Sequence, residues 1–504
     1  MPGGGAATAR LCSSNRLLNT EASIKPAHAQ VAAAAGAPAE SPRLHRKLSA
    51  FDALLLTLSC ISPVFSVYGP GSDVLQHAGT GAAALFLIGI GAAAIWGMVY
   101  AELGSAYPYA GGDYVGVGSV LGPAAGFASL ALWAVTAVPL NAFLARMVAT
   151  YFIEVVPTAS ASGITLLALA LAAGAALLAL RAGAALTGVF LAIELLAVLA
   201  LIVAGLWHPT GNLVAVVMHP RVPDAAGEWL PVASATMAMG AVNAAFATCG
   251  GNQAIAFGEE LVEPHRNVGR VILAACLIGA AGVALPVIAA AWGASGHADL
   301  FLGNAPFTAL VTSLWGPAAG KVLSGAVALA VFNALIAQLL FTARLFFSFA
   351  RDGIFPSRLN AALARVHPGS GAPRTATVVV TLGALACCLI PWHVLLVFLS
   401  GLVPYALILV SIAVLVGRRR GQTGGAGFWR SPLYPLAPIL GIALALAFSA
   451  AQWVDPEAGR PSLLILGALI LASLAWYRFV LSRRPGGWAP RLESSNMTAA
   501  DRRS

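Results

Sequence analysis

The sequence predicts an all-α polytopic membrane protein with about twelve transmembrane helices. Only 9% of its 504 residues are charged, 59% are hydrophobic, and the mean hydropathy is +0.84. A soluble chain normally carries about 25% charged residues. Apolar stretches of about 20 residues, the length that an α-helix needs to cross a bilayer, recur along the chain. Basic residues gather in alternate loops between these stretches, as they do in multi-pass membrane proteins.

The apolar stretches divide into individual predicted spans. Their approximate limits are 50–77, 81–101, 122–154, 161–180, 183–207, 231–258, 269–292, 320–349, 375–391, 393–416, 433–453 and 462–481. Residues 1–45 are rich in Ala, Gly and Pro, which predicts a disordered cytoplasmic tail; a transit peptide is the alternative. We expect one integrated membrane domain over 46–481 and a second cytoplasmic tail over 482–504.

The distribution of basic residues predicts the orientation. If both termini are cytoplasmic, most of the 28 Lys and Arg residues lie inside, and only Arg221, Lys321 and Arg460 lie outside. This bias follows the positive-inside rule. The net charge of +9 is therefore expected to face anionic membrane lipid rather than nucleic acid. We expect a multi-pass protein of the plasma or inner membrane.

Two of the predicted spans are interrupted by residues that break helices. Span 6 contains "ATCGGNQAIAFGEE" at 247–260, and span 1 contains "CISPVFSVYGPG" at 60–71. In hydrocarbon every unpaired backbone group costs several kcal/mol, so such breaks need protein or a polar cavity around them. The two breaks lie five spans apart, and an odd number of spans inverts the second unit. This pattern predicts a midplane binding site; close packing at Gly250-Gly251 and a kink at Pro63 are the alternative.

Four motifs in order give the chain a family resemblance. They are "SPVFSVYGPGS" in span 1, "YAELGSAYPYAGGDYVGVGSVLGP" at 100–123, "CGGNQAIAFGEELVEPHRNVGRVI" at 249–272 and "FNALIAQLLFTARLFFSFARDGIFPSRLNAALARVHPGSGAPRTA" at 332–376. With them the chain resembles the amino acid–polyamine–organocation (APC) transporters, amino acid permease type. The resemblance implies a LeuT-type fold, with one repeat at about 50–207, an inverted repeat at about 231–416 and two extra helices at about 433–481. It also implies secondary transport of amino acids or related amines by alternating access, as symport or exchange, without ATP hydrolysis.

The resemblance places the substrate at the two breaks. The residues implied to face it are Ser62, Pro63, Val64, Phe65, Ser66, Phe246, Thr248, Cys249, Gly250, Gly251 and Asn252. Backbone groups of the span 1 break would face a carboxylate, because the positive end of a helix favours an anion. The family often has an acidic residue where Asn252 stands, and an amide cannot balance a full positive charge. The substrate is therefore expected to be neutral or zwitterionic. Trp133 is a further candidate for an aromatic wall, although ordinary helix packing explains it better.

Acidic residues at the cytoplasmic ends of spans 2 and 6 predict an inside gate. Glu102 ends span 2, and Glu259 and Glu260 end span 6, where a carboxylate opposes the helix macrodipole and needs a partner. We expect Glu259 or Glu260 to pair with Arg351 at the end of span 8. The alternative is a set of solvated charges, whose pairing contributes little to stability.

Glu194 lies near the middle of the apolar span 5. Ionisable residues inside a membrane are candidates for function. Many members of the family carry a lysine near this position, so the charge is reversed here. An apolar surrounding favours the protonated form of a carboxyl group, so Glu194 is the candidate for coupling transport to protons. A sodium site is the rival, and a simple hydrogen bond to a neighbouring helix is the structural alternative.

Other motifs add little. The chain has no phosphate-binding glycine loop with its lysine, and its Cys and His residues have no zinc or catalytic spacing. We therefore predict neither a catalytic residue, nor a metal site, nor a cofactor, and no enzymatic activity. The amphipathic loop "GAGFWR" at 425–430 receives no role. Two alternatives stay open: an antiporter for polyamine or GABA-like substrates, and a membrane sensor that binds an amine in the same pocket without moving it.

Overall fold

The computed structural model describes residues 48–490 apart from 110, 178–183, 208, 210, 304, 366–372 and 485–487. The predicted tail over 1–45 lies outside the described residues, as does the end of the predicted C-terminal tail. The α-helices are α2 Ala50–Ile61, α3 Pro63–Ser66, α4 Ser72–Ala78, α5 Ala82–Ala106, α6 Asp113–Leu121, α7 Pro123–Val155, α8 Ala161–Leu177, α9 Ala184–Trp207, α10 Leu213–Met218, α11 Ser234–Thr248, α12 Pro264–Gly293, α13 Pro306–Trp315, α14 Pro317–Arg351, α15 Ser357–Leu363, α16 Arg374–Cys387, α17 Trp392–Ser400, α18 Leu402–Arg419, α19 Leu436–Val454 and α20 Gly459–Phe479. Shorter helical turns are η1 Val67–Gly71, η2 Gly79–Gly81, η3 Gly251–Phe257, η4 Ala298–Phe301 and η5 Leu481–Arg483.

The described structure confirms the predicted all-α membrane fold. Among the described residues, eight stretches of helix are long and apolar enough to cross a membrane, and the first of them, Ala50–Ala106, covers predicted spans 1 and 2. The shorter apolar helices α8 and α16 coincide with spans 4 and 9. Each of the other predicted spans also overlaps helical structure. The sheet in the described part of the chain is one antiparallel hairpin, in which β1 Arg221–Pro223 pairs with β2 Trp229–Pro231.

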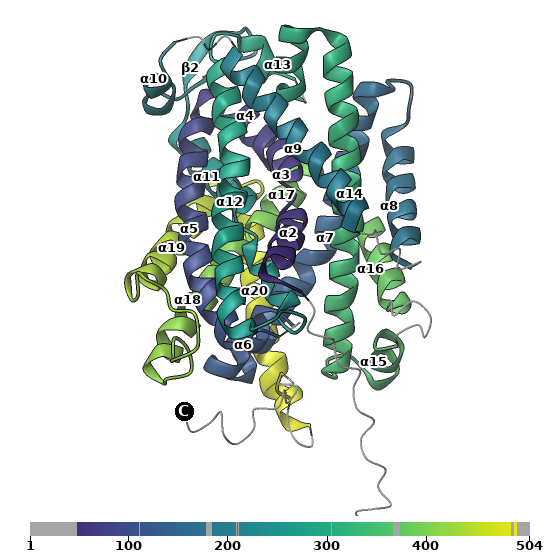
Figure 1. Ribbon diagram of the computed structural model, residues 1–504, viewed down its shortest axis with the longest axis vertical. Coiled ribbons are helices and arrows are strands. Elements are labelled where there is room, and N and C mark those ends of the chain that lie inside the picture. Colours follow the sequence, from purple (N-terminus) through teal and green to yellow (C-terminus); the bar gives the residue numbers. More distant parts are fainter. Residues whose placement is uncertain are drawn as a thin grey trace, which may run out of the picture. The chain divides into compact units, whose positions relative to one another are not determined.

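The helices of the membrane domain run between two opposite ends (Figure 1). One end carries α10, the β1–β2 hairpin and α13, and is called the hairpin end below. The other end carries α6 and α15, and is called the α6 end. Within the domain α12 packs against α5 and α9, and α14 packs against α7 and α16. A Cβ atom on Gly205 in α9 would collide with the backbone of Ala289 in α12, so a small residue allows these two helices to touch.

The first broken span shows why its helix stops where it does. A capping box starts α2: the Ser49 side chain accepts from the Asp52 amide, and the Asp52 side chain accepts from the Ser49 amide, each at 3.1 Å. The helix ends at Ser62, which has a φ of 44°. A left-handed conformation is unfavourable for a residue other than glycine and persists only where its surroundings hold it. Pro63 then begins α3, a position where its missing N–H is not needed.

The second broken span opens at a glycine pair. α11 ends at Thr248, Cys249 is extended, and the chain continues from Gly251 as the 3₁₀ helix η3. A Cβ atom on Gly251 would lie 2.6 Å from the Cys276 sulfur and 2.8 Å from the Ile272 carbonyl oxygen. Only glycine therefore allows the unwound segment to lie this close to α12. The two breaks are neighbours, because α2 packs against η3 and α11 packs against η1.

Candidate functional site

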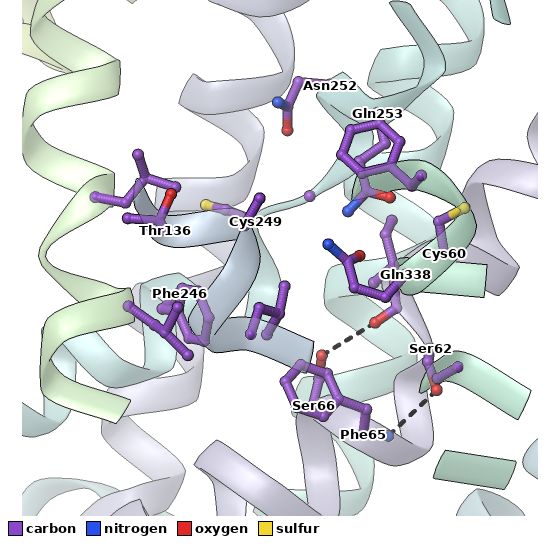
Figure 2. Close-up of a pocket in the computed structure, with 18 of the residues that line it drawn as sticks. Cys60, Ser62, Phe65, Ser66, Thr136, Phe246, Cys249, Asn252, Gln253 and Gln338 are labelled. Carbon is purple, nitrogen blue, oxygen red and sulfur yellow. Dashed lines mark hydrogen bonds between the residues drawn. The ribbon is translucent and has the colours of Figure 1, made fainter. Parts of the chain in front are cut away.

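A cavity of about 90 Å³ lies between the two helix breaks. α2 and α3 form one side, and the end of α11 and the start of η3 form the other. Helices α5, α7, α14, α17 and α18 complete the wall. Figure 2 shows Ser62, Phe65 and Ser66 from the first break together with Phe246, Cys249 and Asn252 from the second. The breaks therefore meet at a hollow in the interior of the membrane domain, where a transporter would hold its substrate.

The lining of this cavity contains no charged side chain among the described residues. Its polar side chains are Ser62, Ser66, Thr136, Asn252, Gln253 and Gln338, and the remainder of the wall is aromatic, aliphatic or thiol. A buried charge is costly unless an opposite charge pairs with it. The cavity therefore suits a ligand whose charges are balanced within itself or are met by backbone groups.

The sequence-predicted binding residues divide into two groups. Those that line the cavity are Ser62, Phe65, Ser66, Phe246, Cys249, Gly250 and Asn252. Those that do not line it are Pro63, Val64, Thr248 and Gly251. Val64 is fully buried in the core, and the Thr248 hydroxyl donates to the Gly89 carbonyl at 2.9 Å. Gly251 packs against α12, and Pro63 faces Gly282 of the same helix.

Several lining residues were not predicted from the sequence. Trp96 comes from α5, Thr136 from α7 and Gln338 from α14, none of which is broken. The Trp96 ring donates from Nε1 to Asn252 Oδ1 at 3.3 Å, so α5 orients the amide of the second break. Trp133, for which packing was the preferred interpretation, also lines the cavity. The sequence feature that could have indicated such a lining residue is a polar side chain, such as Gln338, within an apolar helix.

Glu194 contacts the first break directly. Its side chain is 1% exposed, and its Oε2 accepts a hydrogen bond from the Ser62 hydroxyl at 3.2 Å. The same Ser62 oxygen accepts from the Phe65 amide at 3.4 Å, so one hydroxyl joins α3 to α9 (Figure 2 shows the second of these bonds). Glu194 Oε1 is buried and has no hydrogen-bond partner in the described part of the chain. A change in the charge of this carboxyl group would therefore act on the residue that holds the break.

A second, smaller cavity of about 30 Å³ adjoins the first. The two share Trp133, Asn252, Gln253 and Phe341 in their walls. The second cavity is also lined by Asp113, the first residue of α6. Trp133 Nε1 donates to Asp113 Oδ2 at 2.8 Å, and the Tyr100 hydroxyl donates to the same oxygen at 3.2 Å. Burial raises the pKa of Asp113 to about 6.

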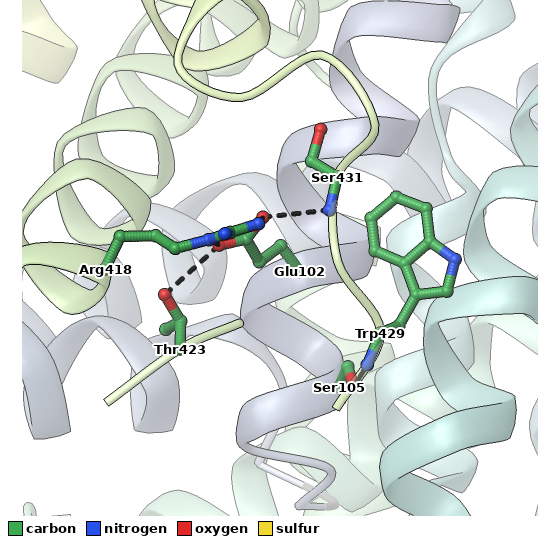
Figure 3. Close-up of polar contacts among 6 residues, drawn as sticks. All are labelled: Glu102, Ser105, Arg418, Thr423, Trp429 and Ser431. Atoms are coloured by element: carbon green, nitrogen blue, oxygen red, sulfur yellow. Dashed lines mark hydrogen bonds and ion pairs between the residues drawn. The ribbon is translucent and has the colours of Figure 1, made fainter. Parts of the chain in front are cut away.

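Glu102, which the sequence grouped with a cytoplasmic gate, has its ion-pair partner elsewhere. Figure 3 shows its buried carboxylate held by Arg418, whose Nε lies 2.6 Å from Oε1 and whose Nη2 lies 3.0 Å from Oε2. Thr423 and the amide of Ser431 donate to the same carboxylate at 3.2 and 3.1 Å. Glu102 thus fixes the loop after α18 to the end of α5.

Of the other predicted gate residues, Glu259 and Arg351 lie near Tyr109 and Tyr114 at the start of α6, whereas Glu260 lies beside the residues before α2. The nearby Glu259 carboxylate adds to burial in raising the pKa of Tyr109. Burial and Asp352 raise the pKa of Tyr114, and Arg351 acts in the opposite direction. Glu260 pairs through its carbonyl with the Leu48 amide at 3.0 Å. A gate between Glu259 or Glu260 and Arg351 stays a prediction.

The model of the Amino acid permease family matches residues 48–474 of this sequence. The chain belongs to this family. Its matched region includes both breaks, both cavities and the Glu102 site. In the described residues no group of three His, Cys, Asp or Glu side chains is placed to hold a metal ion.

Curated relatives share a low identity with the permease. It is 28% identical over 329 residues to Asc-type amino acid transporter 1 of Mus musculus, covering 60% of this chain and 59% of the relative. It is 24% identical over 412 residues to the Branched-chain amino acid permease BcaP of Lactococcus lactis subsp. cremoris, covering 74% and 82%. It is 26% identical over 442 residues to Large neutral amino acids transporter small subunit 2 of Homo sapiens, covering 80% and 76%. The chain spans less than two thirds of the Asc-type transporter that it matches.

Proposed function

We propose that this permease is a secondary transporter that carries neutral amino acids, as zwitterions, by alternating access. The observation that carries this proposal is the cavity between the two helix breaks, whose described lining has no charged side chain. A zwitterion brings one positive and one negative charge and needs no net charge from the protein. A polyamine brings several positive charges and would leave them unpaired in this wall.

The two breaks offer groups of opposite polarity to a zwitterion. Helix α3 begins at Pro63, and the positive end of its backbone dipole favours a carboxylate. Helix α11 ends at Thr248, and the negative end of its dipole favours an ammonium group. The names of two relatives agree with this substrate class, since one is a branched-chain amino acid permease and another a large neutral amino acids transporter.

Glu194 is the proposed coupling residue. Its Oε2 accepts a hydrogen bond from Ser62, and its Oε1 has no hydrogen-bond partner among the described residues. An ionised carboxylate in an apolar helix pair is costly, so proton binding and the conformation of the break should depend on each other. The transporter would then couple the movement of its substrate to the movement of protons, by symport or by exchange.

The α6 end and both termini are proposed to be cytoplasmic, in a plasma or inner membrane, with the basic residues at this face near anionic lipid.

The proposal is tested by binding and flux. The detergent-solubilised protein is screened by thermal shift against neutral amino acids, GABA, putrescine and spermidine. A specific ligand stabilises by roughly 2.7 kcal/mol at a hundredfold excess over its Kd. Ligands that stabilise are then measured as radiolabelled substrates in proteoliposomes.

We expect neutral amino acids to stabilise the protein and to accumulate. Binding without flux would indicate a sensor. Flux of putrescine or GABA, only in exchange for a second substrate, would indicate the antiporter. No response to any of these compounds would refute the proposed substrate class.

A further inference from the structure

Asp113 is a buried carboxylate that lacks a positive partner. Its side chain is 6% exposed, and its hydrogen bonds come from Tyr100, Trp133 and backbone amides, all of which are neutral donors. No Lys, Arg or His of the described residues forms an ion pair with it. Its pKa of about 6 leaves it mostly ionised at neutral pH. A buried negative charge without a cation is costly, and a cation that reaches it gains the missing pairing.

An acceptor without a hydrogen-bond partner among the described residues also lies in the wall of this cavity. Gln253 follows the second break, and its Oε1 is buried without a hydrogen-bond partner among the described residues. Gln253 also lines the main cavity, where Figure 2 shows it together with Asn252 and Gln338. A buried carbonyl oxygen normally has a donor, so this oxygen is able to accept a hydrogen bond from a donor group that enters the cavity.

The space beside these acceptors fits a small cationic group. The cavity holds about 30 Å³, and one water-sized group needs roughly 10–15 Å³. An ammonium group is about as large as a water molecule and carries three N–H donors. The Trp133 ring, part of both walls, adds an aromatic surface that attracts cations.

We propose that Asp113 and Gln253 form a second binding site, which takes the primary ammonium group of the substrate as it leaves the main cavity toward the α6 end. This site rests on the proposed function, because it requires a substrate with an ammonium group. The shared residues Trp133, Asn252, Gln253 and Phe341 make the two sites adjacent, so a substrate that leaves the main cavity past these side chains reaches Asp113 next. Asp113 attracts the ammonium group and lowers the barrier to release.

The first test uses n-butylammonium chloride as a probe of the ammonium site alone. Melting temperature is measured in detergent for the parent, D113N, D113E and Y100F, with sodium butyrate and tetramethylammonium chloride as controls. Asparagine keeps the shape but loses the charge, glutamate keeps the charge, and Y100F loses one hydrogen bond to Asp113. We expect butylammonium to stabilise the parent, D113E and Y100F, and to have no effect on D113N. Butyrate and tetramethylammonium, which lack N–H donors on a cation, should stabilise none of them.

The second test measures exchange in proteoliposomes with a neutral amino acid that the parent carries. D113N should lower kcat by about tenfold with little change in KM, because the main cavity is intact. D113E, which keeps the negative charge, should stay closer to the parent than D113N, which a merely structural role of Asp113 would not predict. Equal stabilisation of parent and D113N by butylammonium would overturn the site.

The two proposals fail in different ways. If the parent carries no amino acid, the proposed function fails, and the melting shift with butylammonium still decides the ammonium site. If D113N does not fold, the parent must still prefer butylammonium to tetramethylammonium, and an equal response to both overturns the site.

Discussion

Gly250 leaves little room for a side chain beside Ile61. A Cβ atom there would lie 3.1 Å from Ile61 Cγ1, which itself lines the cavity. G250L would therefore push a branched side chain between the two breaks. We expect this variant to insert and fold but to lose transport, measured as uptake in proteoliposomes at equal protein density. G91L is the matched control, because a Cβ at the exposed Gly91 meets nothing within 4 Å. Normal uptake by G250L would remove this glycine from the site.

Asn252 sets the charge of the main cavity. Its Oδ1 accepts from Trp96 Nε1 at 3.3 Å, and aspartate keeps this acceptor while adding a negative charge. We expect N252D to shift binding preference from neutral amino acids toward cationic amines, because the new buried charge needs a partner. Competition of putrescine against a neutral amino acid measures the shift. The inference about selectivity is wrong if the parent already binds putrescine better.

Asp113 should give the protein a specific pH dependence. Burial raises its pKa from 3.8 to about 6, so between these values the folded protein holds a proton that the unfolded chain has released. Rising pH therefore lowers stability across this range, and the loss is complete above about 6. Each pKa unit corresponds to roughly 1.4 kcal/mol. Tyr100 is the titratable group that donates to it in the described residues. D113N lacks this component, so its melting temperature relative to the parent should rise from pH 4 to 6. If the melting temperatures of D113N and the parent change in parallel between pH 4 and 6, Asp113 is not the source of this pH dependence.

The broken elements were predictable from sequence, and their surroundings were not. Pro63 and the Gly250-Gly251 pair are local signals, because each prevents a regular helix whatever surrounds it. Asn252, Phe246 and Ser62 followed from those breaks and do line the cavity.

Gln338 and Trp96 were not predicted as lining residues. They lie in unbroken helices, and only the packing of α14 and α5 brings them to the same space. The partner of Glu102 was also hidden, because Arg418 is 316 positions further along the chain.

The loop between α18 and α19 is held by the Glu102 ion pair. Trp429 lies against Gly269 of α12, and its amide donates to the Ser105 hydroxyl at 2.7 Å. The sequence indicated no role for this loop, whereas in the structure it joins α18 to α5 and α12 (Figure 3 shows its contacts with α5).

E102Q should therefore destabilise the protein. It would leave the part-exposed Arg418 without its ion-pair partner and weaken the hydrogen bonds that the carboxylate accepts, and a hydrogen bond to a charged group contributes about 1.5–3 kcal/mol. We expect a lower melting temperature in detergent than for E154Q, which changes an exposed glutamate. If E102Q melts together with the control, this ion pair does not hold the loop.

At the scale of the whole molecule, the proposed path of the substrate passes through the two cavities. The main cavity lies at the breaks, and the Asp113 cavity continues from it to α6, at the end of the domain opposite the hairpin. Glu194 lies outside both linings but contacts Ser62, the residue that ends α2 and caps α3. Substrate and proton would thus act on the same break from two sides. This geometry allows them to be coupled without direct contact, since both change the stability of one conformation.

Glu194 provides the decisive test of that coupling. Glutamine resembles the protonated carboxyl group and can still accept from Ser62, so E194Q should keep substrate binding and exchange. It cannot take up or release a proton, so it should lose accumulation driven by a pH gradient. Proteoliposomes with an imposed gradient and no sodium measure this, with exchange between equal internal and external substrate as the control. S62A, which removes the hydroxyl but leaves the carboxyl group, should retain gradient-driven uptake at a lower rate. Accumulation by E194Q at the level of the parent would show that the proton is bound elsewhere.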